Sequence, residues 1–296
     1  MNDAQRPAGP VECATLDPQA PMWGTAEQVD LWLLLEAPGT WPAQALGAEG
    51  PLAPAARQWL ESQLAALSAM GLKVRAQLIK QPRAASDQRR SLLLGYGGRL
   101  LAHDGTAGLP QPPLKSLLTA MDGGEDTAPG WRVLRRPRYF VCTNGRRDLC
   151  CARYGMPVYA ALRERFGDRA WQTSHVGGHR FAANVLTLPR GALYGRLQLD
   201  TLEPFVTQVE RGEVAFEWLR GRSAYRPLVQ AAEALLGQQR ARLLHVDGDD
   251  RQATVRFATP SGVREVSLRR SLKPQWILAG CDKPARKETY PYESLG

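Results

Sequence analysis

Two short segments in the middle of the chain carry two thiols and two imidazoles. Cys142 and Cys151 lie in the first segment, and His175 and His179 lie in the second. Of the 5 cysteines and 4 histidines in the chain, three cysteines and two histidines fall between residues 142 and 179. Such clustering is typical of a site with chemistry, and of a metal centre above all. The fold is therefore expected to bring these two segments together.

The spacing within each segment favours loops. Gly177 and Gly178 separate the two histidines. Since each glycine costs about 1 kcal/mol in a helix relative to alanine, we expect a loop that turns both imidazoles to one centre. Cys142 and Cys151 are nine residues apart, whereas structural zinc sites usually take cysteines only about two to four residues apart. A longer loop suits a larger group such as an iron–sulfur cluster, although the Rieske order of one cysteine and one histidine per loop is absent.

Composition predicts a soluble globular protein. A content of 44% hydrophobic and 23% charged residues is typical of such proteins. The length of 296 residues is enough for two domains with hydrophobic cores. The longest apolar run, Leu31 to Leu35, is too short to span a bilayer, so no membrane partner is expected. The N-terminus lacks an apolar signal core and the cysteine count is odd, so we expect a cytoplasmic protein without a disulfide framework.

The net charge of +9 raises the question of an acidic partner. The basic residues are spread along the chain and no aromatic-interleaved nucleic-acid motif occurs. We therefore expect the basic surface to dock an acidic redox protein, or to be merely a solvated surface, rather than to bind nucleic acid.

The first half of the chain predicts an α/β domain. After a loose leader over residues 1–21, a buried strand is expected at 30–36 and a helix from Pro54 to Gly71. Two more strands are expected at 74–79 and 91–94. We predict an N-terminal α/β domain over 22–103, a candidate thioredoxin-like domain in its own right. Gly, Pro and acidic clusters make 104–130 a linker, with a short helix at 114–121.

The second half predicts another α/β domain, over 131–240, followed by a β-rich tail over 241–296. A strand at 138–141 runs into Cys142, and a strand at 171–174 delivers His175. Both segments therefore follow the C-terminal ends of strands, where α/β folds usually place their sites. The other expected elements are a helix that starts at Gly155 and Pro157, a hairpin of 185–188 and 193–197, helices at about 202–210 and 227–236, and a hairpin of 254–259 and 263–268.

The two segments resemble the sucrase/ferredoxin-like family. The matching stretches are Cys142-Thr-Asn-Gly-Arg-Arg-Asp-Leu-Cys-Cys-Ala152, Ser174-His-Val-Gly-Gly-His-Arg-Phe-Ala-Ala-Asn184, Tyr194-Gly195, Arg220-Gly-Arg-Ser223, Gln230-Ala-Ala-Glu233, Gly24-Thr-Ala26 and Trp32-Leu-Leu-Leu-Glu36. The resemblance covers roughly residues 13–285. It implies a thioredoxin-like ferredoxin domain that holds a 2Fe-2S cluster for electron transfer. Many members carry a histidine two residues after the first cysteine, where this chain has Asn144.

On the family pattern, the cluster ligands are Cys142, Cys151, His175 and His179, with Cys150 as the alternative to Cys151. Each imidazole ligand leaves one ring nitrogen for a proton, so coupled electron and proton uptake is expected. Residues beside the ligands are candidates for bracing the cluster through hydrogen bonds or for merely shaping the loops, as a local ion pair of Arg147 and Asp148 would. They are Arg147, Asp148, Gly177, Gly178 and Asn184.

Two other functions fit the residues. One is a structural Cys2His2 zinc protein, and the other is a thiol–disulfide oxidoreductase that uses Cys142 or the pair Cys150–Cys151. No Cys-x-x-Cys motif occurs, which weighs against the second. No Gly-x-Ser-x-Gly motif is present, so no hydrolase site and no catalytic residue are assigned. Cys13 and Cys281 are expected to be ordinary buried or surface thiols.

Overall fold

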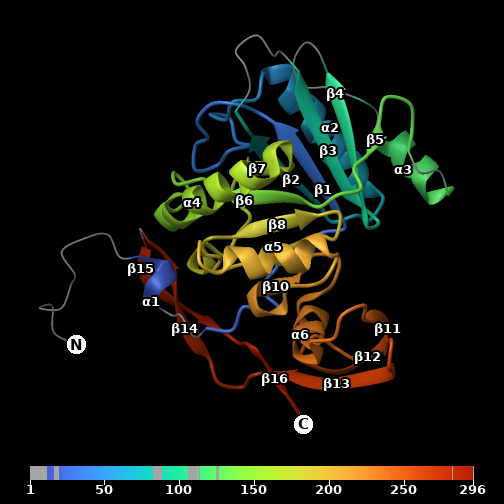
Figure 1. Ribbon diagram of the computed structural model, residues 1–296, viewed down its shortest axis with the longest axis vertical. Helices are drawn as coiled ribbons and strands as arrows, with labels where there is room; N and C mark the ends of the chain where they lie inside the picture. Colours follow the sequence, from blue (N-terminus) through green and yellow to red (C-terminus); the bar gives the residue numbers. More distant parts are fainter. Residues whose placement is uncertain are drawn as a thin grey trace, which may run out of the picture.

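The computed structural model describes residues 12–16, 20–82, 89–105, 112, 114–124, 127–281 and 283–295. One ten-stranded sheet forms its centre, with strands in the order β10-β9-β8-β6-β7-β2-β1-β3-β4-β5 (Figure 1). Helices and two smaller sheets surround it, so the expected α/β class with a β-rich C-terminal part is confirmed.

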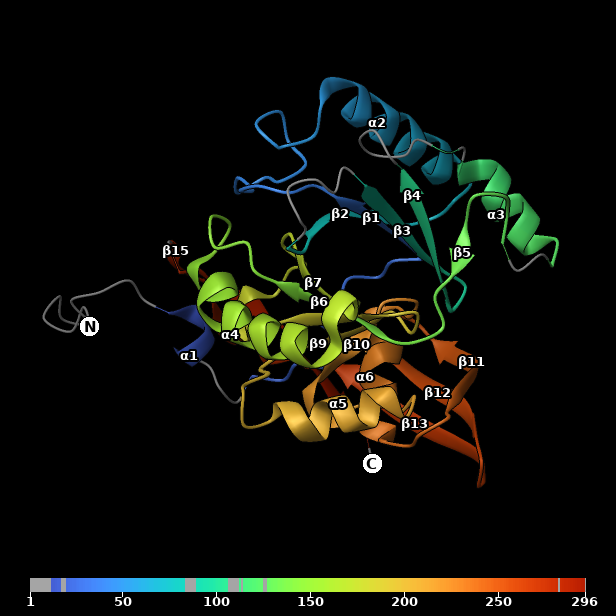
Figure 2. The same ribbon diagram turned by 45° about the horizontal axis from the view of Figure 1, so that its top comes forward.

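The first half of the sheet is built around β1 (Leu31–Glu36), whose six residues are all buried. It pairs in parallel with β2 (Val74–Lys80) and antiparallel with β3 (Arg90–Tyr96). Helix α2 (Pro54–Ala69) lies along these strands (Figure 2) and buries Leu60 and Leu67 against alternate leucines of β1. Proline suits the first turn of α2 because its missing N–H has no intrahelical partner there.

The strand β4 (Arg99–Gly105) was not expected from the sequence. It pairs with β3 through a tight hairpin, in which Gly97 and Gly98 have φ angles of 56° and 74°. Two consecutive residues at positive φ are typical of the two-residue hairpin turn. Beyond β4, the short β5 (Arg132–Val133) ends the sheet.

The second half of the sheet is centred on β6 (Arg138–Cys142). It pairs in parallel with β7 (Ala170–Thr173) and antiparallel with β8 (Val185–Leu188). Strands β9 (Ala192–Tyr194) and β10 (Leu219–Arg222) complete this half. Helices α4 (Leu149–Phe166) and α5 (Leu202–Glu210) share one buried apolar cluster with β6, which leaves the other face of β6 to a separate cluster.

The two halves are joined within one sheet. Strand β2 pairs antiparallel with β7, and the register sets Ile79 opposite Thr173 and Lys80 opposite Gln172. The strands of the predicted ranges 22–103 and 131–240 thus form two adjacent blocks, except that β5 pairs with β4 of the first block. The domain limits themselves stay a prediction.

The C-terminal part follows α6 (Pro227–Leu236) and forms two small β units, of which the first packs on α6. A four-stranded sheet contains β11 (Arg242–Gly248), β12 (Gln252–Thr259), β13 (Gly262–Arg270) and β16 (Tyr292–Ser294). The predicted hairpin is confirmed as β12–β13. A separate hairpin of β14 (Gln275–Gly280) and β15 (Lys283–Thr289) lies beside the short helix α1 (Cys13–Leu16), as Figure 1 shows. Residues 13–16 thus pack beside a hairpin that lies far from them in the sequence.

Several local predictions hold and some need correction. The short helix in the linker range is α3 (Leu114–Asp122), and the helices predicted at 202–210 and 227–236 are α5 and α6. The helix expected to start at Gly155 and Pro157 begins instead at Leu149 and contains Pro157. The second strand of the predicted hairpin ends at Tyr194 rather than Leu197.

Most of the predicted leader and parts of the predicted linker lie outside the described residues. Within those that are described, no helix combines the length and apolar character needed to cross a membrane.

Candidate metal centre

Cys142, Cys151 and His175 converge at one edge of the sheet. Cys142 is the last residue of β6, and His175 follows β7 by two residues, so both lie at the carboxyl ends of paired parallel strands. Nδ1 of His175 lies 3.4 Å from Sγ of Cys151 and 3.9 Å from Sγ of Cys142. One ligand atom from each residue falls within 4.8 Å of the others, a separation that suits shared metal binding.

Cys151 reaches this group from the first turn of α4 rather than from a loop. The Asp148 carboxylate caps the helix by accepting a hydrogen bond of 3.0 Å from the backbone N–H of Cys150. Helical geometry then separates the directions of the adjacent Cys150 and Cys151 side chains. Cys151 joins the apolar cluster of Cys142, and Cys150 joins a different one.

Gly155 allows α4 to come close to the end of β6. A side chain at this position would collide with the backbone carbonyl of Cys142. Glycine is therefore needed here for close backbone approach rather than as a helix start.

The histidine loop depends on two glycines in the left-handed region. Gly177 and Gly178 have φ angles of 82° and 68°, and a side chain on Gly178 would collide with the guanidinium of Arg220. Asn184 Nδ2 donates a hydrogen bond of 2.9 Å to the carbonyl of Gly178. The backbone carbonyl of Asn184 accepts a hydrogen bond of 2.9 Å from the backbone N–H of Cys142. Asn184 thus braces the loop against the end of β6.

Arg220 lies at the centre of these contacts, with 2% of its surface exposed. Its Nη1 donates to the carbonyl of Gly177 at 2.9 Å and to Oδ1 of Asn184 at 2.8 Å. Its Nη2 donates to the carbonyl of Thr25 at 2.8 Å. Burial lowers the pKa of Arg220 to about 9, while negative charge on Cys142 and Cys151 opposes that shift. The sequence pattern contains Arg220 but gives no sign of this role.

The backbone of His175 is fixed by the neighbouring strand β2. Its carbonyl accepts hydrogen bonds from Nη2 of Arg75 at 3.0 Å and from Nε2 of Gln77 at 3.2 Å. Arg75 in turn forms an ion pair with Glu27. The imidazole is left to face the two thiols.

The surroundings of Cys142 favour its thiolate form. Its pKa lies well below the ordinary value, because the Cys151 thiol hydrogen-bonds to it and because His175 and the N–H of Val176 favour the thiolate against the effect of burial. A thiolate is the form that binds a metal.

His179 stands beside the group but makes other contacts through Nδ1. That atom lies 3.1 Å from Sγ of Cys13 and 3.2 Å from Oδ2 of Asp148. The rings of His175 and His179 are 5.8 Å apart between centroids. Burial lowers the pKa of His179, which favours the neutral imidazole. Three of the predicted ligands thus form one group, the fourth is adjacent, and the ligand set as a whole stays a prediction.

Asp148 and Cys150 belong to a second group that includes Cys13 and Cys281. Local spacing gives no sign of it, since Cys13 and Cys281 are 268 residues apart in the sequence. Asp148 is buried, whereas the neighbouring Arg147 is exposed to solvent. The Asp148 carboxylate contacts the backbone N–H of Cys150, Nδ1 of His179 and Sγ of Cys281. It is engaged by these groups rather than by a local ion pair with Arg147.

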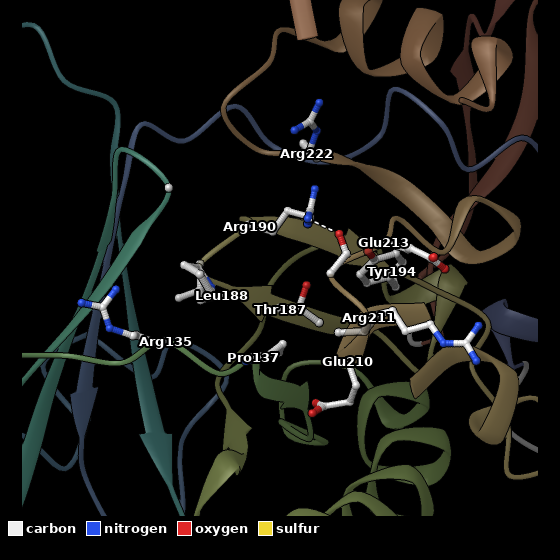
Figure 3. Close-up of a pocket in the computed structure, with 14 residues that line it drawn as sticks. Arg135, Pro137, Thr187, Leu188, Arg190, Tyr194, Glu210, Arg211, Glu213 and Arg222 are labelled. Atoms are coloured by element: carbon white, nitrogen blue, oxygen red, sulfur yellow. Dashed lines mark hydrogen bonds between the residues drawn. The ribbon is translucent and has the colours of Figure 1, made fainter. Parts of the chain in front are cut away.

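A hollow of about 520 Å³ lies elsewhere, between the β8–β9 turn and the end of α5 (Figure 3). Its lining residue Leu188 pairs with Arg138 at the start of β6, whereas Cys142 is at the end of that strand. Arg222 on its wall is paired with Glu233, and Arg190 donates to the carbonyl of Gly212. This hollow is separate from the Cys/His group.

Comparison with known proteins identifies one family. The family model described as sucrase/ferredoxin-like matches residues 22–221, a span that contains both Cys/His segments and Arg220 but neither Cys13 nor Cys281. No match was found among curated proteins or among solved structures. Because the family model covers more than half of the 296 residues, the chain belongs to the sucrase/ferredoxin-like family.

Proposed function

We propose that this protein transfers electrons through a 2Fe-2S cluster held by Cys142, Cys151, His175 and His179. The observation that carries the proposal is the convergence of two thiols and an imidazole, with a second imidazole adjacent and a buried guanidinium bonded to the histidine loop. A cluster with two thiolate and two imidazole ligands supplies one-electron redox chemistry and has a higher potential than one with four thiolates.

The donor set fits such a group in charge as well as in type. Arg220 is a buried cation, and negative charge on Cys142 and Cys151, the form in which thiols bind a metal, favours its charged form. An interior guanidinium needs compensating negative charge. Arg220 therefore supports an anionic centre at this position and stabilises the additional negative charge that reduction brings.

Partner access is proposed on the side of His175. Both histidines are partly exposed. A hollow beside His175 is lined by residues 43–47, Asn144 and the exposed Arg147. This edge, in a chain of net charge +9, suits an acidic redox protein, because opposite charge steers association.

A structural zinc ion is the second candidate, since three donors within 4.8 Å also suit a single ion. Colour separates the two functions. We expect anaerobically purified protein to be brown, to contain two irons with two labile sulfides, and to bleach with dithionite. Colourless protein with zinc on Cys142 and Cys151 would overturn the proposal.

Variants test the ligands one by one. Cys142→Ser and His175→Ala should lose or alter the visible absorption, because each removes a proposed iron ligand. Cys151→Ser should do the same, whereas the matched variant Cys150→Ser should keep both irons. The reverse outcome at 150 and 151 would move the ligand by one residue, and an unchanged spectrum in Cys142→Ser and His175→Ala would exclude the assignment.

A further inference from the structure

We propose a second metal site, formed by Cys13, Cys150, Cys281 and Asp148, that binds one zinc ion in tetrahedral coordination. The four residues come from α1, from the start of α4 and from the turn of the β14–β15 hairpin. Two of them lie outside the residues matched by the family model.

The three sulfurs form a compact triangle. The Sγ–Sγ distances are 3.1 Å for Cys150–Cys281, 3.4 Å for Cys13–Cys281 and 3.7 Å for Cys13–Cys150. Zn–S bonds of about 2.3 Å in a tetrahedron set the sulfurs about 3.8 Å apart. The thiols therefore stand at close to the required separations and need to move outward by less than about 1 Å.

Asp148 supplies the fourth donor. Its Oδ1 lies 3.1 Å from Sγ of Cys281 and 3.8 Å from Sγ of Cys13. The backbone N–H groups of Cys150 and Cys281 donate to the carboxylate at 3.0 and 3.1 Å and hold it in place. Such outer hydrogen bonds orient a ligating carboxylate.

The chemistry of the donors selects the ion. Thiolate-rich sites favour soft or borderline metals, and a closed tetrahedral set is characteristic of structural zinc. Cys13 and Cys150 are buried, at 1% and 0% exposure, and Cys281 is half-buried. The three thiolates and the carboxylate fill all four positions of a tetrahedron, which leaves none for a substrate. A disulfide joins only two sulfurs at about 2.05 Å and leaves the third unused, whereas one ion engages all three.

Such an ion would clamp both terminal segments to the helix that carries Cys151. Nδ1 of His179 contacts Cys13 and Asp148, so the proposed zinc site directly adjoins the proposed cluster site. They use different cysteines, however, and each can be removed without taking a ligand from the other.

Metal analysis of the full chain tests the proposal. We expect one zinc per chain in addition to any iron. Cys13→Ser and Cys281→Ser should lower zinc below about a tenth of the wild-type content and leave iron unchanged. Cys142→Ser should do the opposite, losing iron and keeping zinc. If the protein lacks iron altogether, zinc that still depends on Cys13 and Cys281 would support this site while the proposed function fails.

Cobalt provides a spectroscopic check. Cys142→Ser protein, or His175→Ala protein if the first does not fold, gives a background free of the cluster. Adding Co²⁺ after removal of zinc should produce the absorption of tetrahedral cobalt thiolate, and the additional change Cys281→Ser should abolish it. Absence of both zinc and the cobalt spectrum would overturn the proposal. So would a third iron in place of zinc, or a disulfide among these cysteines in mass spectra of the unreduced chain.

Discussion

Arg220 carries a positive charge into an interior where no carboxylate within the described ranges pairs with it. Its hydrogen bonds go to two backbone carbonyls, to Asn184 and to the hydroxyl of Thr25. The guanidinium therefore does two things. It holds the loop that carries both histidines, and it places a charge beside the thiols of Cys142 and Cys151.

The first prediction concerns that charge. Arg220→Gln should lower the reduction potential of the bound centre by tens of millivolts, because about 1.4 kcal/mol of lost interaction corresponds to about 59 mV for one electron. Voltammetry of the purified variant provides the measurement. Arg220→Lys is the matched control, since it keeps the charge, and it should retain most of the potential. A potential unchanged in Arg220→Gln with both irons present would show that the charge has no such role.

At the scale of single residues, the clustering of thiols and imidazoles pointed to the two segments that hold Cys142 and His175. The family pattern, rather than local spacing, favoured Cys151 over Cys150. Arg220, Cys13 and Cys281 escaped prediction because their partners are distant in sequence, and the Cys13–Cys281 contact spans 268 residues. Only the folded chain shows such a neighbourhood.

At the scale of elements, the site depends on how closely α4 approaches the end of β6. The start of this helix was mispredicted because Gly155 and Pro157 look like start signals, while the effective signal is the cap at Asp148. Strands with clear alternation or continuous apolar runs, such as β1 and β12–β13, were predictable. The adjoining β4 was missed although Gly97 and Gly98 mark its turn.

The second prediction reverses an ordinary propensity rule. Gly155→Ala should destabilise the protein by at least about 1 kcal/mol, although alanine is the better helix former, because the added carbon meets the carbonyl of Cys142. Urea unfolding with iron content provides the measurement. Ala160→Gly, at an exposed position of the same helix, is the control and should cost about 1 kcal/mol through propensity alone. A stabilising Gly155→Ala would refute the close approach.

At the scale of the whole molecule, one sheet runs through both predicted domains, and helix α1 lies beside the β14–β15 hairpin (Figure 1). The α/β class and the β-rich end follow from the sequence pattern. The pairing of β2 with β7, which joins the two halves of the sheet, does not follow from the pattern, because it involves only two residues from each strand. Short pairings of this kind leave no periodic signal.

The third prediction follows from the clamp at the chain ends. Cys281→Ser should increase tryptic cleavage at the exposed Arg286 and Lys287 several-fold relative to cleavage within 22–221, because the hairpin loses its anchor. Timed proteolysis with mass spectrometry measures this ratio. Cys142→Ser, which leaves the clamp intact, should not raise it. Equal ratios in the two variants would indicate that no ion holds the hairpin.

The contact between Cys13 and Cys281 also has a meaning for the unfolded chain. An ion that stays bound at both residues in the unfolded chain would close 268 residues into a ring, which removes on the order of 5 kcal/mol of loop entropy from the denatured ensemble. That quantity grows only with the logarithm of ring size. Lengthening or shortening the segment 104–130 by a few residues would therefore hardly alter it, and the benefit of the ring would persist while the sequence inside it varies.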